Sequence, residues 1–205
     1  GVRLNCLSPI LRRMNSPLLD ITDVACTREG RELFAHLNLQ VQTGECVELT
    51  GPNGSGKSTL LRCITGLFPD YEGSIVASGM LFVGHRPGVS ALLTPLENLR
   101  WYQGLTDSAD TALAALARVG LSGYEEVRCQ NLSAGQHRRV CLARLLVCQA
   151  PLWLLDEPFT ALDDGGQVLV RELIVAHCAQ GGAVVCATHQ PLGLADTVTL
   201  RLGGS

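Results

Sequence analysis

The apolar residues of the first fifty positions recur in short runs that are separated by turn-forming residues. Residues 18–24, 36–41 and 46–50 have the pattern of strands, with a turn at residues 28–30 and Gly44 before the third run. The first helix should begin at residues 56–57 and end near residue 65, because glycine, here Gly66, is favoured just past a helix end. Three strands therefore precede the first predicted helix.

Farther along the chain, continuous apolar runs alternate with helical segments. Helices are expected after Ser133 and over residues 167–180. The expected strands lie at residues 80–84, 152–155, 183–187 and 197–202. Apolar strands that alternate with helices are typical of a parallel sheet with both faces covered. The pattern therefore predicts an α/β fold.

The chain is expected to divide into a short N-terminal extension and one domain. Residues 1–17 contain three arginines around a short apolar piece, and this order is not that of a secretory signal. We expect this segment to be disordered or to lie upstream of a true start at Met14. Residues 18–205 should form one domain, in which residues 94–130, with an alanine-rich stretch, make a small helical subdomain.

Composition argues against two classes of protein. The 19 acidic and 16 basic side chains leave a net charge of -3 and form no basic block, so nucleic-acid binding is not expected. No apolar run reaches the roughly 18 residues that a membrane span needs. Only 17% of the residues are charged, whereas an average soluble protein has roughly 25%. Part of the surface is therefore expected to meet a partner.

Nine cysteines are scattered through the chain, and no CxxC pair occurs among them. An odd number without ligand spacing indicates neither a disulfide framework nor a zinc site. We interpret these cysteines as small buried apolar residues in a reducing compartment.

The clearest chemical motif is a glycine-rich loop between the third strand and the first helix. Residues 51–58 read GPNGSGKS and match the phosphate-binding pattern GxxxxGK[ST] in full. Its glycines let backbone N–H groups turn toward an anion at the positive end of the helix. Lys57 would contact the β- and γ-phosphates, and Ser58 would bind Mg²⁺. The candidate nucleotide-binding residues are Gly51, Pro52, Asn53, Gly54, Ser55, Gly56, Lys57, Ser58 and Thr59.

Two adjacent acids, Asp156 and Glu157, follow the apolar strand at residues 152–155. The carboxyl end of a buried strand is where α/β folds place their ligands. We expect Asp156 to hold Mg²⁺ and Glu157 to orient and polarise the attacking water. Together with the glycine-rich loop, the two acids predict Mg²⁺-dependent hydrolysis of a nucleoside triphosphate.

A third motif, LSAGQ at residues 132–136, opens the helix before the acidic strand. It resembles the LSGGQ signature of ATP-binding cassette (ABC) proteins, and the resemblance covers about residues 18–203. The resemblance implies the RecA-like parallel-sheet core of P-loop NTPases, with an antiparallel β-subdomain and the helical subdomain. It also implies that Ser133, Gly135 and Gln136 face the nucleotide of a second copy, so that a complete site needs a homodimer.

Other positions either match this family or depart from it. Asp163 resembles the D-loop aspartate and His189 the switch histidine that contacts the γ-phosphate, so the implied catalytic residues are Glu157, His189 and Lys57. His85 stands where the family places a glutamine that touches Mg²⁺, which makes it the third candidate metal residue beside Ser58 and Asp156. Arg28 stands where an aromatic residue usually stacks on adenine, and a guanidinium plane can still stack on a base.

Several segments are similar to one subfamily, the ATP-binding subunits of bacterial cytochrome c maturation systems. They include GHRPG at residues 84–88 and THQPL at residues 188–192. The resemblance implies an ATPase at the cytoplasmic face of the inner membrane that uses ATP and Mg²⁺. It would dock on a membrane-spanning subunit and support haem export or delivery. Trp101 and Tyr102 are candidates for the docking surface.

Three alternatives to this function remain. The chain could serve another ABC transporter, act as a soluble ABC ATPase of DNA repair or translation, or be a P-loop kinase or other small-molecule enzyme. A soluble ABC ATPase would need a coiled-coil insertion or a second cassette, and a kinase would give LSAGQ no role. The cargo and the direction of transport do not follow from the sequence.

Overall fold

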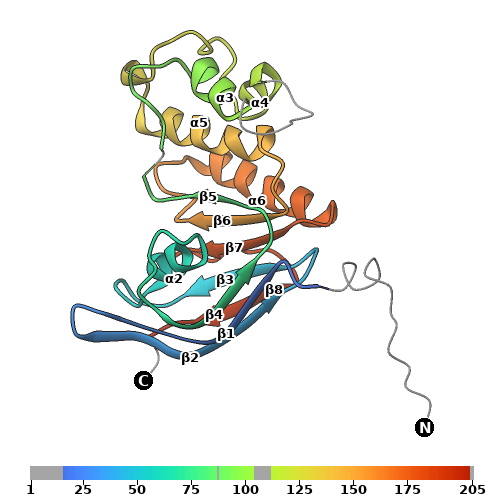
Figure 1. The fold of residues 1–205 in the computed structure, drawn as a ribbon. Coiled ribbons are helices and arrows are strands. Elements are labelled where there is room, and N and C mark those ends of the chain that lie inside the picture. Colours follow the sequence, from blue (N-terminus) through green and yellow to red (C-terminus); the bar gives the residue numbers. More distant parts are fainter. Residues whose placement is uncertain (1–15, 87, 104–111, 204–205) are drawn as a thin grey trace.

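The computed structural model describes residues 16–86, 88–103 and 112–203, which form two sheets of different kinds (Figure 1). The predicted N-terminal extension lies almost entirely outside these residues. The first sheet is antiparallel, with the strand order β2-β1-β4. Its strands are β1 (Leu19–Arg28), β2 (Arg31–Val41) and β4 (Glu72–Ala77).

The first two strands are longer than the sequence pattern predicted. We expected them over residues 18–24 and 36–41, but they continue to a tight hairpin at Glu29 and Gly30. Both turn residues have positive φ, 53° and 76°, and this backbone matches the twist of a two-residue hairpin. Bulges in the β1–β2 pairing interrupt the alternation of buried and exposed side chains. The strands predicted from this alternation are therefore shorter than the observed ones.

The second sheet is parallel, as the apolar runs predicted, with the order β5-β6-β7-β3-β8. Its strands are β3 (Cys46–Thr50), β5 (Met80–Val83), β6 (Leu152–Asp156), β7 (Ala183–Ala187) and β8 (Thr197–Arg201). Every residue of β6 and β7 is buried. The carboxyl ends of β3, β6 and β7 therefore meet at one edge of the sheet.

Helices cover both faces of the parallel sheet. They are α2 (Lys57–Ile64), α3 (Pro95–Gln103), α4 (Ala112–Arg118), α5 (Ala134–Val147) and α6 (Asp164–Ala179), with a short 3-10 turn η1 (Cys129–Asn131). Helices α3 and α4 pack on α5, beyond the edge strand β5 (Figure 1). The start of α6 was predicted three residues too late, because the side chain of Asp163 accepts a hydrogen bond from the Gly166 N–H and caps the helix earlier.

Two hydrophobic clusters lie on opposite sides of the parallel sheet. Leu152 and Leu154 of β6 pack with the antiparallel sheet and α2, whereas Trp153 and Leu155 pack with the helices α3 to α6. Because alternate residues of a strand point to opposite faces, β6 contributes to both clusters. This packing confirms the predicted α/β fold with a parallel core and an antiparallel sheet.

Most cysteines lie in these clusters. Of those that the structure describes, all but the half-buried Cys178 are buried, and Cys6 lies outside the described residues. Burial raises the pKa of the Cys46 and Cys63 thiols to about 12. Thiols with so high a pKa stay protonated at neutral pH and are poor nucleophiles. The interpretation of these cysteines as small core residues is therefore confirmed for the described part of the chain.

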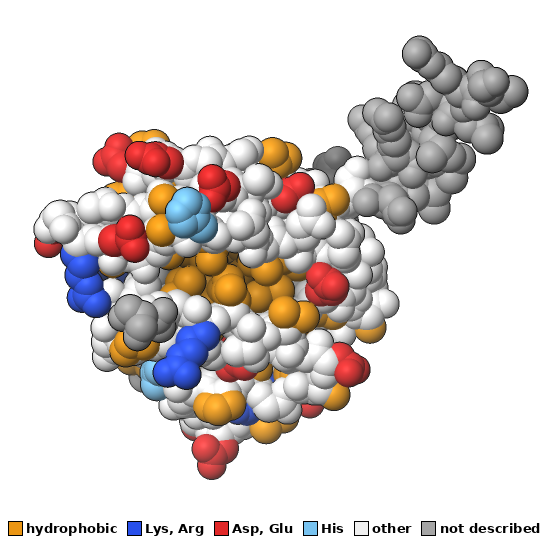
Figure 2. Space-filling model, turned by 90° about the horizontal axis from the view of Figure 1, so that it is seen from below, with side chains coloured by type: hydrophobic (Ala, Val, Ile, Leu, Met, Phe, Trp, Pro, Cys, Tyr) orange, Lys and Arg blue, Asp and Glu red, His pale blue; other side chains and the backbone are white. Residues whose placement is uncertain are grey.

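The surface combines charged side chains with some apolar ones. Seen from below, hydrophobic side chains gather in a hollow in the middle of one face, with charged side chains around it (Figure 2). Among the residues that the structure describes, no helix combines the length and the apolar character that crossing a bilayer requires.

Candidate nucleotide-binding site

The glycine-rich loop curls between the end of β3 and the start of α2. Gly51, Gly54 and Gly56 all have positive φ, at 139°, 79° and 98°. A Cβ at Gly51 would collide with the Leu202 carbonyl oxygen. The fold therefore demands glycine here, and the loop stays narrow enough to bring its backbone N–H groups close to an anion.

Lys57 lies inside this loop and not in solvent. The residue is 7% exposed, and Nζ donates to the carbonyl oxygens of Gly51, at 2.7 Å, and Pro52, at 3.1 Å. A positive charge is thus held at the N-terminal end of α2, where the helix dipole also favours negative ligands. This arrangement suits the phosphates of a nucleotide.

Ser58 and Asp156 are brought together although they are 98 positions apart in the sequence. The Ser58 hydroxyl donates to Asp156 Oδ1 at 2.8 Å, and Asp156 is 1% exposed at the end of β6. A hydroxyl and a carboxylate are hard oxygen ligands of the kind that Mg²⁺ prefers. Among the described residues no group of three His, Cys, Asp or Glu could hold a metal.

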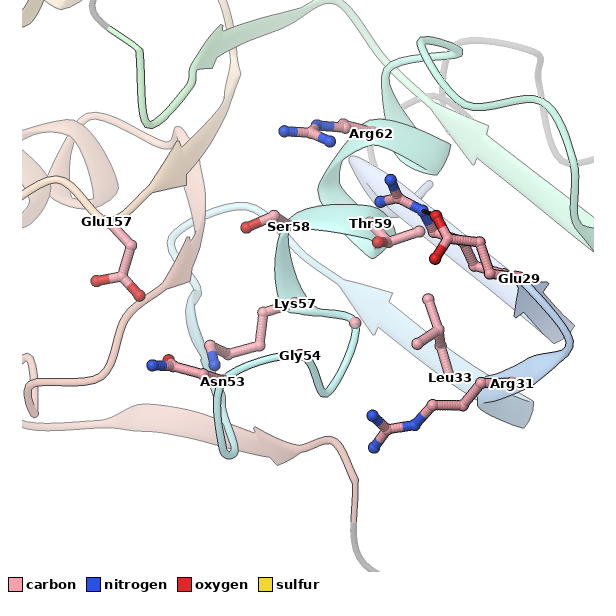
Figure 3. Close-up of a pocket in the computed structure, with 12 residues that line it drawn as sticks. Glu29, Arg31, Leu33, Asn53, Gly54, Lys57, Ser58, Thr59, Arg62 and Glu157 are labelled. Atoms are coloured by element: carbon pink, nitrogen blue, oxygen red, sulfur yellow. Dashed lines mark ion pairs between the residues drawn. The ribbon is translucent and has the colours of Figure 1, made fainter.

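Glu157 and His189 form a second pair beside the loop. His189 Nδ1 lies 2.7 Å from Glu157 Oε2, and the Glu157 N–H donates to the Ala187 carbonyl at the end of β7. Glu157 has φ of 50°, an unusual backbone for a residue with a side chain. Its carboxylate points toward the loop that holds Asn53 and Lys57 (Figure 3).

The glycine-rich loop, Ser58 and Glu157 border a pocket of about 700 Å³. The pocket is lined by Arg28, Glu29, Arg31, Leu33, Asn53, Gly54, Gly56, Lys57, Ser58, Thr59, Arg62 and Glu157 (Figure 3). Arg28, the candidate for stacking on the base, is among these lining residues. Gly51, Pro52, Asp156 and His189 are not in the lining but contact it through Lys57, Ser58 and Glu157. Ser55 of the loop is buried, and a Cβ added at Gly203 would collide with its side chain.

Sequence reasoning missed part of this lining, namely Glu29, Arg31, Leu33 and Arg62. Arg31 and Leu33 are two positions apart on β2, and residues with this spacing share a face of a strand. This spacing is visible in the sequence, but both residues lie before residues 36–41, where we predicted the strand.

Other predicted site residues lie elsewhere in the chain. Ser133, Gly135, Gln136 and Asp163 line a different pocket at the start of α5. Ser133 caps α5, and its partner in the capping box is Gln136. The Gly166 N–H and the Arg139 guanidinium hold the pKa of the Asp163 carboxyl below its usual value. His85 follows β5 and is not in the lining of the nucleotide pocket.

Comparison with known proteins agrees with this geometry. Residues 34–160 match the ABC transporter family, and this segment contains the glycine-rich loop, the LSAGQ motif and both acids. The chain belongs to the ABC transporter family. As a member, it is an ATP-binding and ATP-hydrolysing transporter subunit that acts with a membrane partner.

Relatives of this ABC protein are similar over most of their length. The "Cytochrome c biogenesis ATP-binding export protein CcmA" of Pseudomonas fluorescens is 45% identical over 194 residues, which is 87% of this chain and 92% of that protein. The protein of the same name from Escherichia coli K12 is 42% identical over 198 residues, 90% of this chain and 95% of that protein.

Solved structures of ABC proteins have the same fold. A putative ABC transporter ATP-binding protein from Pyrococcus furiosus superposes with a TM-score of 0.78 at 24% identity, covering 90% of this chain and 96% of the other. A putative metal-chelate type ABC transporter in an inward-facing conformation gives a TM-score of 0.76 at 26% identity, covering 91% and 79%. The predicted ABC architecture is therefore confirmed.

Proposed function

We propose that this chain is the ATP-hydrolysing subunit of a complex that supports c-type cytochrome biogenesis by exporting or delivering haem. The observation that carries the proposal is the near full-length identity of 42–45% to proteins named for cytochrome c biogenesis. The nucleotide site supports the ATPase half of the proposal, and the relatives support the biological role.

Nucleotide binding follows from the loop and the first turn of α2. The backbone N–H groups of residues 53–58 and the charge of Lys57 would hold the β- and γ-phosphates. Arg28 would stack its guanidinium on the base from the β1–β2 hairpin. Ser58 and Asp156 would hold Mg²⁺, which supplies positive charge against the phosphates. The proposed metal site rests on these two residues and does not include His85.

Hydrolysis would depend on the Glu157–His189 pair. The Glu157 carboxylate accepts the proton of the attacking water and orients its lone pair toward the γ-phosphate. His189, whose side chain is 59% exposed, would contact the γ-phosphate while its Nδ1 keeps the Glu157 carboxylate in place. Both groups stand at the ends of neighbouring buried strands, so their separation is set by the sheet.

A second copy would complete the site. Ser133, Gly135, Gln136 and Asp163 form one surface at the N-terminus of α5, where the N–H groups of a 14-residue helix begin. Such an end favours an anion, and the residues that line this surface are all different from those that line the nucleotide pocket. We therefore place the γ-phosphate of a partner copy there, in a homodimer.

The complex would lie at the cytoplasmic face of the bacterial inner membrane, with this subunit peripheral to it. Of the two aromatic residues predicted to dock on the membrane subunit, Trp101 is 61% exposed, near the exposed Leu92 and Leu93 in the chain. Tyr102 instead packs against the core, with the Arg144 guanidinium 4.1 Å above its ring. We therefore propose Trp101 as the docking residue and assign Tyr102 to packing.

Replacing Trp101 with alanine is expected to weaken docking by about tenfold, because exposed aromatics are frequent anchors of interfaces. The measurement is the yield of the full-length chain that copurifies with the membrane subunit. Val175→Ala is the matched control, since Val175 is 53% exposed on α6. Equal yields for the two variants would remove Trp101 from the interface.

The experiment that tests the biological role is a haem-stained gel of a deletion strain. Covalently bound haem should disappear from c-type cytochromes, while b-type cytochromes, whose haem is not covalently attached, should remain. The wild-type gene should restore the bands. Normal covalent haem in the deletion strain would refute this role and favour the ATPase subunit of another ABC transporter.

A further inference from the structure

Arg138 is a buried arginine in the first turns of α5, and within the described part of the chain the hydrogen bonds of its guanidinium all go to backbone carbonyls. The residue is 2% exposed. Nη1 donates to the Gly84 carbonyl at 2.9 Å, and Nε donates to the Pro158 carbonyl at 3.2 Å. Nη2 donates to the carbonyls of Asp156, at 3.2 Å, and Glu157, at 2.6 Å. One side chain thus joins α5, the end of β5 and the turn after β6.

This geometry depends on the shape of the guanidinium. Arginine presents five N–H donors in a rigid plane, and here they reach four carbonyl oxygens on two separate segments. Burial lowers the pKa of Arg138, but arginine keeps its proton inside proteins. A buried charge is tolerated only when hydrogen bonds compensate for the lost water. Lysine, a point charge with three donors, cannot satisfy this set of acceptors.

The carbonyl that receives the shortest of these bonds belongs to Glu157, the residue with φ of 50°. A residue with a side chain in this region of φ is strained and persists only where its surroundings hold it. The Glu157 N–H is fixed on the Ala187 carbonyl at 2.8 Å, and the carbonyl of the same residue is fixed on Arg138. The backbone is therefore clamped on both sides of the carboxylate.

We propose that Arg138 is a positioning residue for ATP hydrolysis, which holds the backbone of residues 156–158 so that the Glu157 carboxylate meets the attacking water. It touches neither nucleotide nor water in this role and acts through Glu157. The inference rests on the proposed ATPase activity, and it adds a residue that the glycine-rich loop, the acids and the LSAGQ motif do not include.

The test compares Arg138→Gln and Arg138→Lys in the full-length chain purified with its membrane partner. We expect kcat for ATP to fall by about 10–100-fold for Arg138→Gln, because a shift of about 1 Å in a reacting group has effects of this size. KM and the Kd for MgATP should stay within about twofold, since the loop, Lys57 and Ser58 are unchanged. Arg138→Lys should recover only part of the rate.

Two further arms separate positioning from a general loss of structure. In a Glu157→Gln background, Arg138→Gln should cause little additional loss, because a residue that acts through Glu157 has nothing left to position. Arg118→Gln is the matched control, since Arg118 pairs with Glu172 on the exposed surface. If Arg138→Gln unfolds the chain, kcat, KM and the Kd for MgATP are compared between Arg138→Lys and the wild type instead.

Three results would overturn the proposal. They are an unchanged kcat in a folded Arg138→Gln protein, a parallel loss of nucleotide affinity, or a full additional loss in the Glu157→Gln background. This test measures ATP turnover and not haem, so a negative haem-stained gel would refute the biological role and leave this test intact.

Discussion

Glu157→Gln is expected to bind MgATP normally and to hydrolyse it slower by about 10²–10⁴-fold, the usual contribution of a general base. The loop, Lys57 and the Ser58–Asp156 pair are untouched, so nucleotide affinity should not change. Glutamine retains an oxygen that can accept from His189, so the geometry of the pair survives while the basic carboxylate is lost. Phosphate release and MgATP titration measure the two effects separately.

The matched control for this variant is Glu172→Gln, which changes an exposed carboxylate that pairs with Arg118. Its turnover should equal that of the wild type. With hydrolysis blocked, an ATP-bound homodimer should accumulate and be visible by size-exclusion chromatography. Turnover by Glu157→Gln near the wild-type rate would show that another group activates the water.

Lys57→Ala is expected to fail earlier, at nucleotide binding. The buried Nζ charge is already directed into the loop by the Gly51 and Pro52 carbonyls, so it contributes to the bound ground state. Losing one charged hydrogen-bonding group of this kind costs about 1.5–3 kcal/mol, or about 10–150-fold in MgATP affinity. Titration with MgATP measures the loss, and Arg118→Ala serves as the control for removing a surface cation.

Lys57 also offers an independent measurement, because it is the one lysine in the printed sequence. Lys57 lines the nucleotide pocket, so a lysine-directed acylating reagent that enters the empty pocket can modify this side chain as well as the N-terminal amine. MgATP should protect Lys57 in the wild type, as seen by peptide mass spectrometry.

The Lys57→Ala gene should also fail to restore covalent haem in the deletion strain. Equal MgATP affinity in variant and wild type, or full restoration of haem, would contradict the assigned role.

The sequence by itself determined the parallel α/β core, the glycine-rich loop and the acids at the end of β6. Each of these is a local signal: a continuous apolar run, a fixed spacing of glycines before a lysine, or a polar pair directly after a buried strand. The order of motifs then identified the family, because several independent spacings agreed. The longer strands β1 and β2 were missed, since bulges break the periodicity on which strand prediction depends.

Only the tertiary structure decided which polar groups meet across the chain. The Ser58–Asp156 contact, the His189–Glu157 contact and the Arg139–Asp163 pair join segments that are far apart in sequence. Trp101 is exposed whereas the neighbouring Tyr102 is packed, and this difference likewise depends on where α5 lies. The role of Arg138 was hidden most completely, because its acceptors are backbone carbonyls. Every residue carries a carbonyl, so no residue type marks the four that one guanidinium reaches; only the packing of α5 against the ends of β5 and β6 selects them.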